Sequence, residues 1–170
     1  MSALTGIRVV ELTSERCALA GKLLGDMGAD VIVVEPPGGS PTRRYEPFAD
    51  DSGEMEDSLH WWHYNTSKRS VVVDLGTPTG VSDLRSLINS ADVVIEAEPL
   101  GSLSDLGVDW EDFSNKRDDL IWVSVTHHGR NGLDPAATDL TILAEGGPVW
   151  SCGYDDQELP PIRGGGNQAF

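Results

Sequence analysis

The sequence predicts an α/β fold, a Rossmann-like and mostly parallel β-sheet with helices on its flanks. Short runs of β-branched apolar residues alternate with amphipathic segments, a pattern typical of strands joined by right-handed helical crossovers. The run Val31–Val34 contains no polar residue, as expected of a strand that is covered on both faces. Glu35 follows directly, at the end of the strand where open α/β sheets place their ligand sites.

Five segments are predicted to be strands, because each is short and rich in valine, isoleucine and leucine. In chain order, the predicted strands are Ile7–Leu12, Val31–Glu35, Val71–Leu75, Ala91–Glu96 and Leu120–Val125. A helix is expected after the first strand, capped by Thr13 or Ser14 and closed by Gly28. Another begins at Thr77-Pro78, with proline in its first turn. Shorter helical pieces are predicted around residues 103–106, 110–116 and 139–145.

Residues 36–66 interrupt this alternation. Proline, glycine, aspartate and serine are mixed there with aromatic residues, without helical or strand periodicity. A loop of this length inside a compact domain is usually functional or covers an interface. Because 170 residues suit one domain, we predict a single domain over residues 1–170 that carries this long loop.

The charge balance limits the classes of partner. Twelve lysine and arginine residues stand against 28 aspartate and glutamate residues, which gives a formal net charge of −16. Such a charge repels phosphates, so it argues against a nucleic acid or an anionic membrane as partner. No apolar run approaches the roughly 20 residues of a membrane span, and the N-terminus lacks the features of a signal peptide. We therefore predict a cytoplasmic location.

The cysteine and histidine residues form no metal or disulfide pattern. Cys17 and Cys152 are too few and too far apart for a disulfide framework or a zinc site. None of the four histidines belongs to a pair with ligand spacing beside a carboxylate, so no metal site is expected.

Two adjacent cations, Lys68 and Arg69, directly precede a predicted strand in this acidic chain. Their charge predicts an anion site at the mouth of the sheet, while a solvated loop is equally consistent with the sequence. Residues 13–21 occupy the position of the dinucleotide-binding fingerprint but contain one glycine, which argues against an NAD-type oxidoreductase.

Three ordered segments carry a family resemblance. They read Leu-Thr-Gly-Ile-Arg-Val-Val-Glu-Leu-Thr at 4–13, Leu-Gly-Asp-Met-Gly-Ala-Asp-Val-Ile-Val-Val-Glu-Pro-Pro-Gly-Gly at 24–39 and Asn-Thr-Ser-Lys-Arg-Ser-Val-Val-Val-Asp-Leu at 65–75. In these segments the chain resembles the family III CoA-transferases, which include formyl-CoA transferase, the carnitine CoA-transferases and the α-methylacyl-CoA racemases. The resemblance implies coenzyme A or acyl-CoA and a carboxylic acid as substrates, with no bound cofactor.

The resemblance also implies an assembly. Members of this family are considerably longer than this chain and form interlocked homodimers, in which C-terminal chain completes the Rossmann-like N-terminal domain. We therefore expect this chain to be a truncated N-terminal part of such a protein. The segment Leu159–Phe170 agrees with that expectation, because it stops without a closing element, although a disordered tail would look the same.

In the family's chemistry an aspartate attacks the acyl-CoA thioester, and a mixed anhydride forms as CoA thiolate leaves. The thiolate then attacks the aspartyl carbonyl before the acceptor carboxylate takes the CoA. Aligning Pro160-Pro161 with the corresponding family segment puts Phe170 at the nucleophile, and phenylalanine cannot do this chemistry. No catalytic residue is therefore identified. The resemblance retains Lys68 and Arg69 as contacts for a CoA phosphate.

Other positions also depart from the family pattern. Residues 96–101 read Glu-Ala-Glu-Pro-Leu-Gly and lack the asparagine, aromatic and arginine residues that border the family's CoA site. Asp105 stands where the family often has an arginine. Thr138 stands where racemases have a histidine, so racemization is disfavoured, and Asp139 is expected to be a helix N-cap.

Two functions remain open. In the first, the protein transfers CoA between an acyl-CoA thioester and a carboxylic acid, with a nucleophile supplied from elsewhere in the chain or by a partner. In the alternative, the protein is a catalytically silent homologue that acts as a binding or partner subunit. An aspartate shortly after Phe170 would favour the first function, because a small shift in alignment would then restore the nucleophile.

Overall fold

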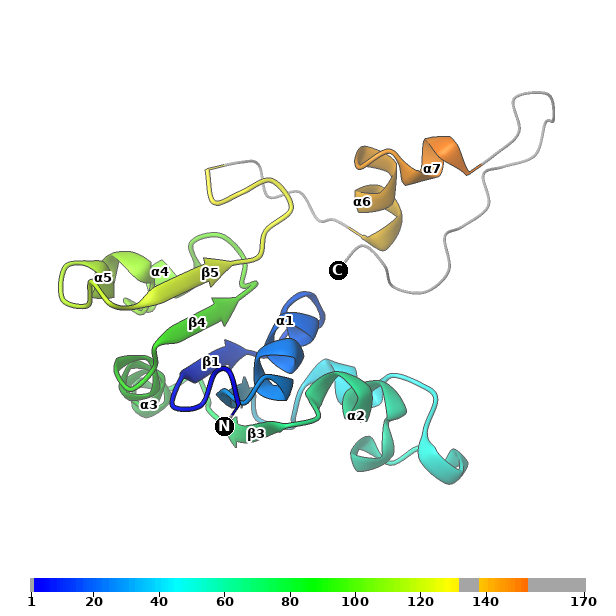
Figure 1. Ribbon diagram of the computed structural model, residues 1–170, viewed down its shortest axis with the longest axis horizontal. Coiled ribbons are helices and arrows are strands. Elements are labelled where there is room, and N and C mark those ends of the chain that lie inside the picture. Colours follow the sequence, from blue (N-terminus) through cyan, green and yellow to red (C-terminus); the bar gives the residue numbers. More distant parts are fainter. Residues whose placement is uncertain (1, 132–137, 153–170) are drawn as a thin grey trace. The chain divides into compact units, whose positions relative to one another are not determined.

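The structure is a computed structural model that describes residues 2–131 and 138–152 (Figure 1). The chain divides into two compact units, residues 1–125 and residues 126–170, and each is described by itself. The expectation of one domain over residues 1–170 stays a prediction. No helix in the described ranges is long and apolar enough to cross a membrane.

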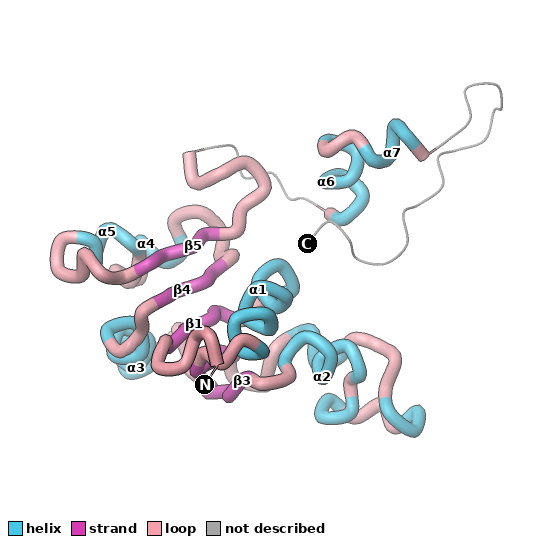
Figure 2. Tube along the Cα trace, viewed as in Figure 1, coloured by secondary structure: helices cyan, strands magenta, loops and turns pink. Residues whose placement is uncertain are grey.

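The first unit is a five-stranded parallel β-sheet with helices on both faces (Figures 1 and 2). Its strands are β1 (Arg8–Leu12), β2 (Asp30–Glu35), β3 (Lys68–Val72), β4 (Val93–Glu96) and β5 (Ile121–Ser124). Its α-helices are α1 (Glu15–Asp26), α2 (Leu59–Asn65), α3 (Pro78–Asn89), α4 (Ser102–Asp105) and α5 (Trp110–Ser114). The strand order is β3-β2-β1-β4-β5, and every neighbouring pair is parallel. The predicted Rossmann-like α/β fold is confirmed, because this is the strand order of that fold.

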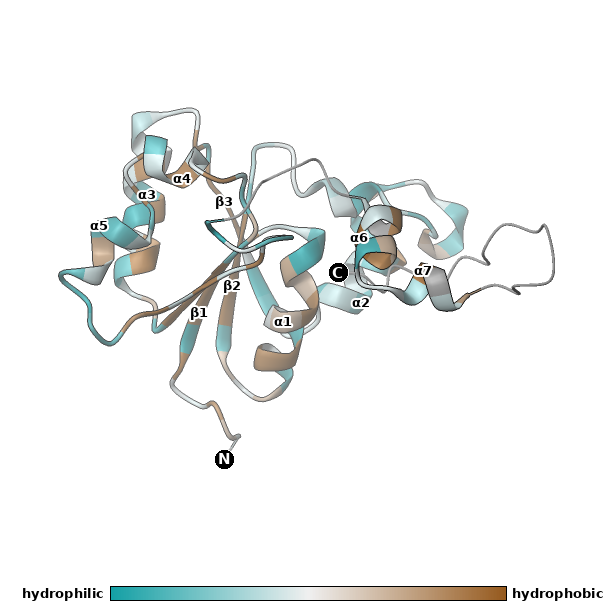
Figure 3. Cartoon of the chain, turned by 90° about the horizontal axis from the view of Figure 1, so that it is seen from above, coloured by the Kyte–Doolittle hydropathy of each residue, from teal (hydrophilic) through white to brown (hydrophobic). Residues whose placement is uncertain are grey.

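Each face of the sheet has its own apolar core, because successive residues of a strand point to opposite faces. Val10 and Val94 pack with Leu84 and Ile88 of α3, and all four are fully buried. On the other face, Val9 packs with apolar residues of α1, β2 and β4. Figure 3 shows α1 on one side of the strands and α3 and α5 on the other. The sheet is therefore covered on both sides, as the apolar strand sequences predicted.

The ends of α1 follow the predicted signals. Ser14, one of the two predicted caps, precedes the helix in an extended conformation, and its side chain accepts a hydrogen bond from the Arg16 amide. Gly28 has a φ of 99°, the left-handed conformation that favours glycine after a helix. The helix predicted at Thr77-Pro78 is also confirmed, because the Thr77 side chain accepts from the amide of Gly80.

Two predictions about the segment before α3 need correction. The third strand was expected at Val71–Leu75 and instead begins at Lys68 and ends at Val72. Its apolar run did not mark its start, because polar residues form the first three positions of the strand. The predicted loop over 36–66 contains α2, capped by Ser58, and three 3₁₀ turns. These turns are η1 (Pro41–Arg44), η2 (Ala49–Asp51) and η3 (Met55–Asp57).

In the second unit, helix α6 (Asp139–Glu145) forms where a helix was predicted. Thr138 is its N-cap and accepts a hydrogen bond from the Thr141 amide, so Asp139 is the first helical residue and not the predicted cap. A short helix that was not predicted, α7 (Pro148–Ser151), follows. Phe170 lies outside the described residues.

The inner face of α1 is built from small residues, which bring the helix close to the sheet. A Cβ atom added at Gly21 would lie 1.6 Å from Oε2 of Glu11. We expect Gly21→Ala to lower the free energy of unfolding by about 1–3 kcal/mol, the usual cost of overpacking. Alanine would otherwise stabilise a helix by about 1 kcal/mol relative to glycine. A loss of stability in Gly21→Ala would therefore show that close packing dominates, and a gain would show that helix propensity dominates.

Urea unfolding of Gly21→Ala and Gly25→Ala would test this prediction. A Cβ at Gly25 would meet the Ser67 carbonyl oxygen at 3.1 Å, a much milder contact, so that variant serves as the comparison. Equal effects of the two substitutions, or a gain in stability for Gly21→Ala, would contradict the close packing of α1 on Glu11.

Candidate functional site

A buried ion pair joins Glu11 of β1 to Lys68 of β3, across the intervening strand. Both side chains are 1% exposed. Nζ of Lys68 donates to Oε1 of Glu11 at 3.0 Å and lies 2.9 Å from Oε2. It also donates to the Ala18 carbonyl at 2.9 Å and to Oδ1 of Asn65 at 3.1 Å. Protein oxygens therefore occupy all the donors of this ammonium group.

The two members of the pair respond to burial in opposite directions. Burial raises the pKa of Glu11 to about 7, although the nearby Lys68 ammonium opposes the change. Burial also lowers the pKa of Lys68, against the attraction of Glu11. Burial thus opposes each charge and the partner supports it, so loss of either partner disfavours the charged form of the group that remains.

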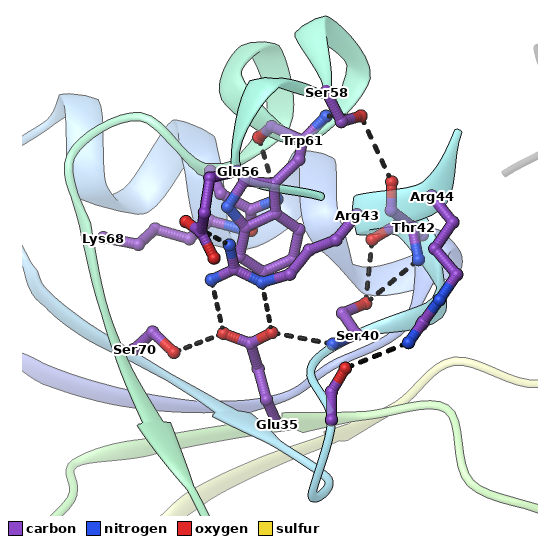
Figure 4. Close-up of polar contacts among 12 residues, drawn as sticks. Glu35, Ser40, Thr42, Arg43, Arg44, Glu56, Ser58, Trp61, Lys68 and Ser70 are labelled. Atoms are coloured by element: carbon purple, nitrogen blue, oxygen red, sulfur yellow. Dashed lines mark hydrogen bonds and ion pairs between the residues drawn. The ribbon is translucent and has the colours of Figure 1, made fainter. Parts of the chain in front are cut away.

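A second buried carboxylate, Glu35, ends β2 and holds the segment that follows it (Figure 4). Nε and Nη2 of Arg43 donate to its two oxygens at 2.7 and 2.8 Å, which is a bidentate pair. The Ser40 amide donates to Oε2 at 2.7 Å, and the Ser70 hydroxyl donates to Oε1. Burial alone would raise the pKa of Glu35, but these hydrogen bonds outweigh it and hold the pKa below its usual value.

Arg43 also connects β2 to the segment that carries α2. Its guanidinium lies 4.0 Å from the centre of the Trp61 ring, a cation–π contact, and Nη1 donates to Glu56 at 3.1 Å. Next to it lies a pocket of about 180 Å³. The pocket is lined by Val33, Arg43, Glu56, Trp61, Trp62, Asn65, Lys68, Arg69 and Ser70.

The structure places the two predicted anion-binding residues in strand β3 rather than in a loop before it. Adjacent residues of a strand point to opposite faces, and these two do so. Lys68 points inward to Glu11, whereas Arg69 is 64% exposed and donates to both oxygens of Asp30, at 2.8 and 2.7 Å. Arg8 donates to the same carboxylate at 3.1 Å. The sequence did not reveal either partner. Their contact with a CoA phosphate stays a prediction.

A row of aromatic and imidazole rings lies beside the N-terminus of α1, and sequence reasoning missed it. The Tyr45 hydroxyl donates to Oε2 of Glu15, the first residue of α1, at 3.2 Å. The Tyr45 and His60 ring centres are 5.0 Å apart, those of His60 and Tyr64 4.8 Å, and those of His63 and Tyr64 4.7 Å. We call Tyr45, His60, His63 and Tyr64 the ring cluster. The i, i+4 spacing of His60 and Tyr64 was visible in the sequence, but only a helix makes them neighbours.

The carboxyl edge of the sheet is acidic where β4 ends. Glu96 is 4% exposed, accepts a hydrogen bond from the Glu98 amide at 2.8 Å and from the Trp122 indole at 3.4 Å. Burial raises the pKa of Glu98, and the neighbouring Glu96 adds to the effect. Asp105 ends the short helix α4 that follows. In parallel α/β sheets, ligands usually bind in a crevice at this edge, at the point where the strand order reverses; here that point lies between β1 and β4.

The sequence and this fold match known proteins. The model of the family described as CoA-transferase family III matches residues 4–168. The chain belongs to CoA-transferase family III. The crystal structure of a CAIB/BAIF family protein from Brucella suis covers 98% of the chain with a TM-score of 0.84 and 34% identity, over 44% of its own length.

Two curated relatives match most of the chain. The subunit BbsE of succinyl-CoA:(R)-benzylsuccinate CoA-transferase from Thauera aromatica is 37% identical over 165 residues, which are 96% of this chain and 40% of the relative. The succinate–glutarate CoA-transferase of Agrobacterium fabrum is 38% identical over 168 residues, 95% of this chain and 42% of the relative. The chain thus spans about two fifths of the length of these relatives.

Proposed function

We propose that the whole protein transfers CoA between an acyl-CoA thioester and a carboxylic acid. The observation that carries this proposal is the match to the CoA-transferase family over residues 4–168. In this proposal the described unit supplies a Rossmann-like domain, with the thioester lying at the carboxyl edge of its sheet. CoA enters as a substrate and the protein holds no resident cofactor. We further propose that it acts in the cytoplasm as a homodimer.

We propose dicarboxylic acids as the substrates. Both relatives carry dicarboxylic acids in their names, and in one of them the donor is succinyl-CoA. Succinyl-CoA is therefore the first acyl donor to try.

Calorimetric titration of the purified full-length protein with CoA and succinyl-CoA at low salt tests the first step. We expect micromolar binding, followed by CoA exchange when a dicarboxylic acid is added. A folded full-length protein that binds neither compound would contradict the proposal. Binding should involve the CoA nucleotide, so CoA should compete with succinyl-CoA while free succinate should not.

The predicted phosphate contacts can be tested in the same titration. If Arg69 contacts a CoA phosphate, Arg69→Gln should weaken CoA binding by about 1–3 kcal/mol. Arg69 is the better candidate of the two, because Lys68 would have to leave Glu11 to reach a phosphate. Arg69 pairs with Asp30 at the amino end of β2, so the phosphate that it contacts would lie away from the thioester. Asp119→Asn, an exposed change on the loop before β5, serves as the control. Unchanged affinity in Arg69→Gln would remove Arg69 from the site.

The alternative function is a catalytically silent partner subunit. One observation favours it: the relative from Thauera aromatica is named as one subunit of its enzyme. The resemblance described above, which implies Phe170 at the position of the nucleophile, points the same way. This alternative predicts that the full-length protein binds CoA but exchanges none by itself, and that exchange appears only with a second, different subunit. Exchange by the purified protein alone would exclude it.

A further inference from the structure

We propose that the ring cluster binds an aromatic ring carried by the acid that exchanges CoA, and so makes the protein selective for aryl-substituted dicarboxylic acids. The inference rests on the proposed CoA transfer and names the substrate class of that site. It is carried by the row of rings formed by Tyr45, His60 and Tyr64, in which Tyr45 is bonded to Glu15, the first residue of α1.

The location of the cluster connects it to the reaction. Glu15, which holds the Tyr45 hydroxyl, follows β1 after only two residues, so the cluster lies at the carboxyl edge of the central strand. Ligands of open α/β sheets bind at this edge, near the point where the strand order reverses. The cluster belongs to the long insertion between β2 and β3, and segments of this length usually serve function.

The rings are held in place while remaining open to a ligand. The hydrogen bond to Glu15 fixes the direction of the Tyr45 ring, yet this side chain is 38% exposed. His60 and Tyr64 are adjacent on one side of α2. The residues that follow each of them in the chain, Trp61 and Asn65, anchor the helix: Arg43 lies over the Trp61 ring, and Lys68 donates to Asn65. A preordered and accessible row of rings can stack on another ring without first paying to order its own side chains.

The charges around the cluster favour stacking over binding of an anion. Burial lowers the pKa of His60, with the charge of Glu15 opposing it and His63 adding to it. The lowered pKa favours the neutral imidazole, and the side chain of Glu15, which accepts from Tyr45, adds a carboxylate beside the rings. A bare carboxylate would be repelled here, whereas the uncharged ring of an aryl acid would pack with edge or offset contacts.

Phenylsuccinate and methylsuccinate are a matched pair of probes, because both carry the same two carboxylates and differ only by a phenyl in place of a methyl group. With succinyl-CoA as donor, we expect the full-length protein to show at least a tenfold higher kcat/KM for phenylsuccinate. Tyr45→Leu should reduce this preference to less than threefold, mainly by raising KM for phenylsuccinate, and should leave methylsuccinate unchanged within twofold.

Leu59→Ala is the control, because Leu59 is an exposed apolar residue of the same helix and lies outside both the ring cluster and the pocket. It should keep the preference. Equal kcat/KM values for the two acids in the unmodified protein, or a preference that survives in Tyr45→Leu combined with Tyr64→Leu, would overturn the inference.

The transfer assay and a direct titration together separate this inference from the proposed function. If the protein transfers CoA to methylsuccinate without preferring phenylsuccinate, CoA transfer stands and the ring cluster has no role in selectivity. If no transfer occurs, direct titration decides: tighter binding of phenylsuccinate that is lost in Tyr45→Leu supports the ring site. Failure of both acids to bind a folded protein overturns it.

Discussion

Replacing Lys68 by methionine should lower the free energy of unfolding at neutral pH by about 3–5 kcal/mol, because Glu11, the Ala18 carbonyl and Asn65 would all lose the ammonium group that donates to them while staying in place. The Lys68 and Glu11 side chains are each 1% exposed, so water cannot take the place of the ammonium group. Methionine keeps the length and apolar stem of lysine, so the change tests the charge more than the packing. Urea unfolding at pH 7, followed by far-UV circular dichroism, measures the difference.

Lys22→Met is the matched control. Lys22 pairs with Asp26 at 2.7 Å at the surface, where the Asp26 side chain is 40% exposed. Pairs of this kind contribute about 0–1 kcal/mol, so its loss should be small. The double substitution Glu11→Gln with Lys68→Met should recover part of the stability, because it removes the buried charge. A loss in the double variant equal to that in Lys68→Met would contradict the ion-pair explanation.

The effect of Lys68→Met should also grow with pH. The pKa of Glu11 is raised from 4.5 to about 7 in the folded state, so the folded state binds this proton more tightly than the unfolded state. The stability from this carboxyl is full below pH 4.5 and falls as pH rises toward 7. Removing Lys68 raises the pKa further, which extends the fall to higher pH. We therefore expect a larger destabilisation at pH 8 than at pH 5, and equal values would contradict the prediction.

Replacing Arg43 by methionine should cost about 3–5 kcal/mol at pH 7, because Glu35 would lose its bidentate partner while remaining 1% exposed. The contact with the Trp61 ring would also disappear. Arg44→Met is the control, since this neighbouring side chain is exposed and donates to the Gly38 carbonyl at 3.2 Å. A loss in Arg44→Met as large as that in Arg43→Met would assign the effect to the turn rather than to the ion pair.

Glu35 should respond to pH in the opposite sense to Glu11. Its pKa is held below 4.5 in the folded state, so its contribution to stability is present above the unfolded pKa and is lost as pH falls through the folded one. The destabilisation by Arg43→Met should therefore shrink below pH 4.5, where the carboxyl becomes neutral in the variant. Unfolding curves at pH 3.5 and pH 7 measure this change.

The strands show how far the sequence predicts the fold. Apolar β-branched runs predicted β1, β2, β4 and β5 to within a few residues, because hydrophobic cores cover both faces of β1, β2 and β4. In β5, at one edge of the sheet, one face joins a core, while Ile121 and Val123 are exposed. β3 lies at the other edge of the sheet, and its inward positions Lys68 and Ser70 bind carboxylates instead of joining a core. Its polar half therefore looked like a loop.

The site was predicted less completely than the fold. The sequence singled out Lys68 and Arg69 by their charge, but the partner of Lys68 is 57 residues away in the chain and on a strand that is not its neighbour. Pairings of this range depend on strand order and register, which local patterns do not specify. The ring cluster was missed for a similar reason, since Tyr45 and Glu15 come from different parts of the chain.

The central place of β1 has a consequence for synthesis. β1 leaves the ribosome before the other four strands of this sheet and is its middle strand, and Val9 pairs both with Val31 and with Val93. The β1–α1–β2 unit can form early, but the other edge of β1 must wait for a segment about 84 residues later. Closing so long a loop slows folding. Until β4 arrives, an apolar edge of β1 is open to other nascent chains, so slower synthesis of this region should increase aggregation.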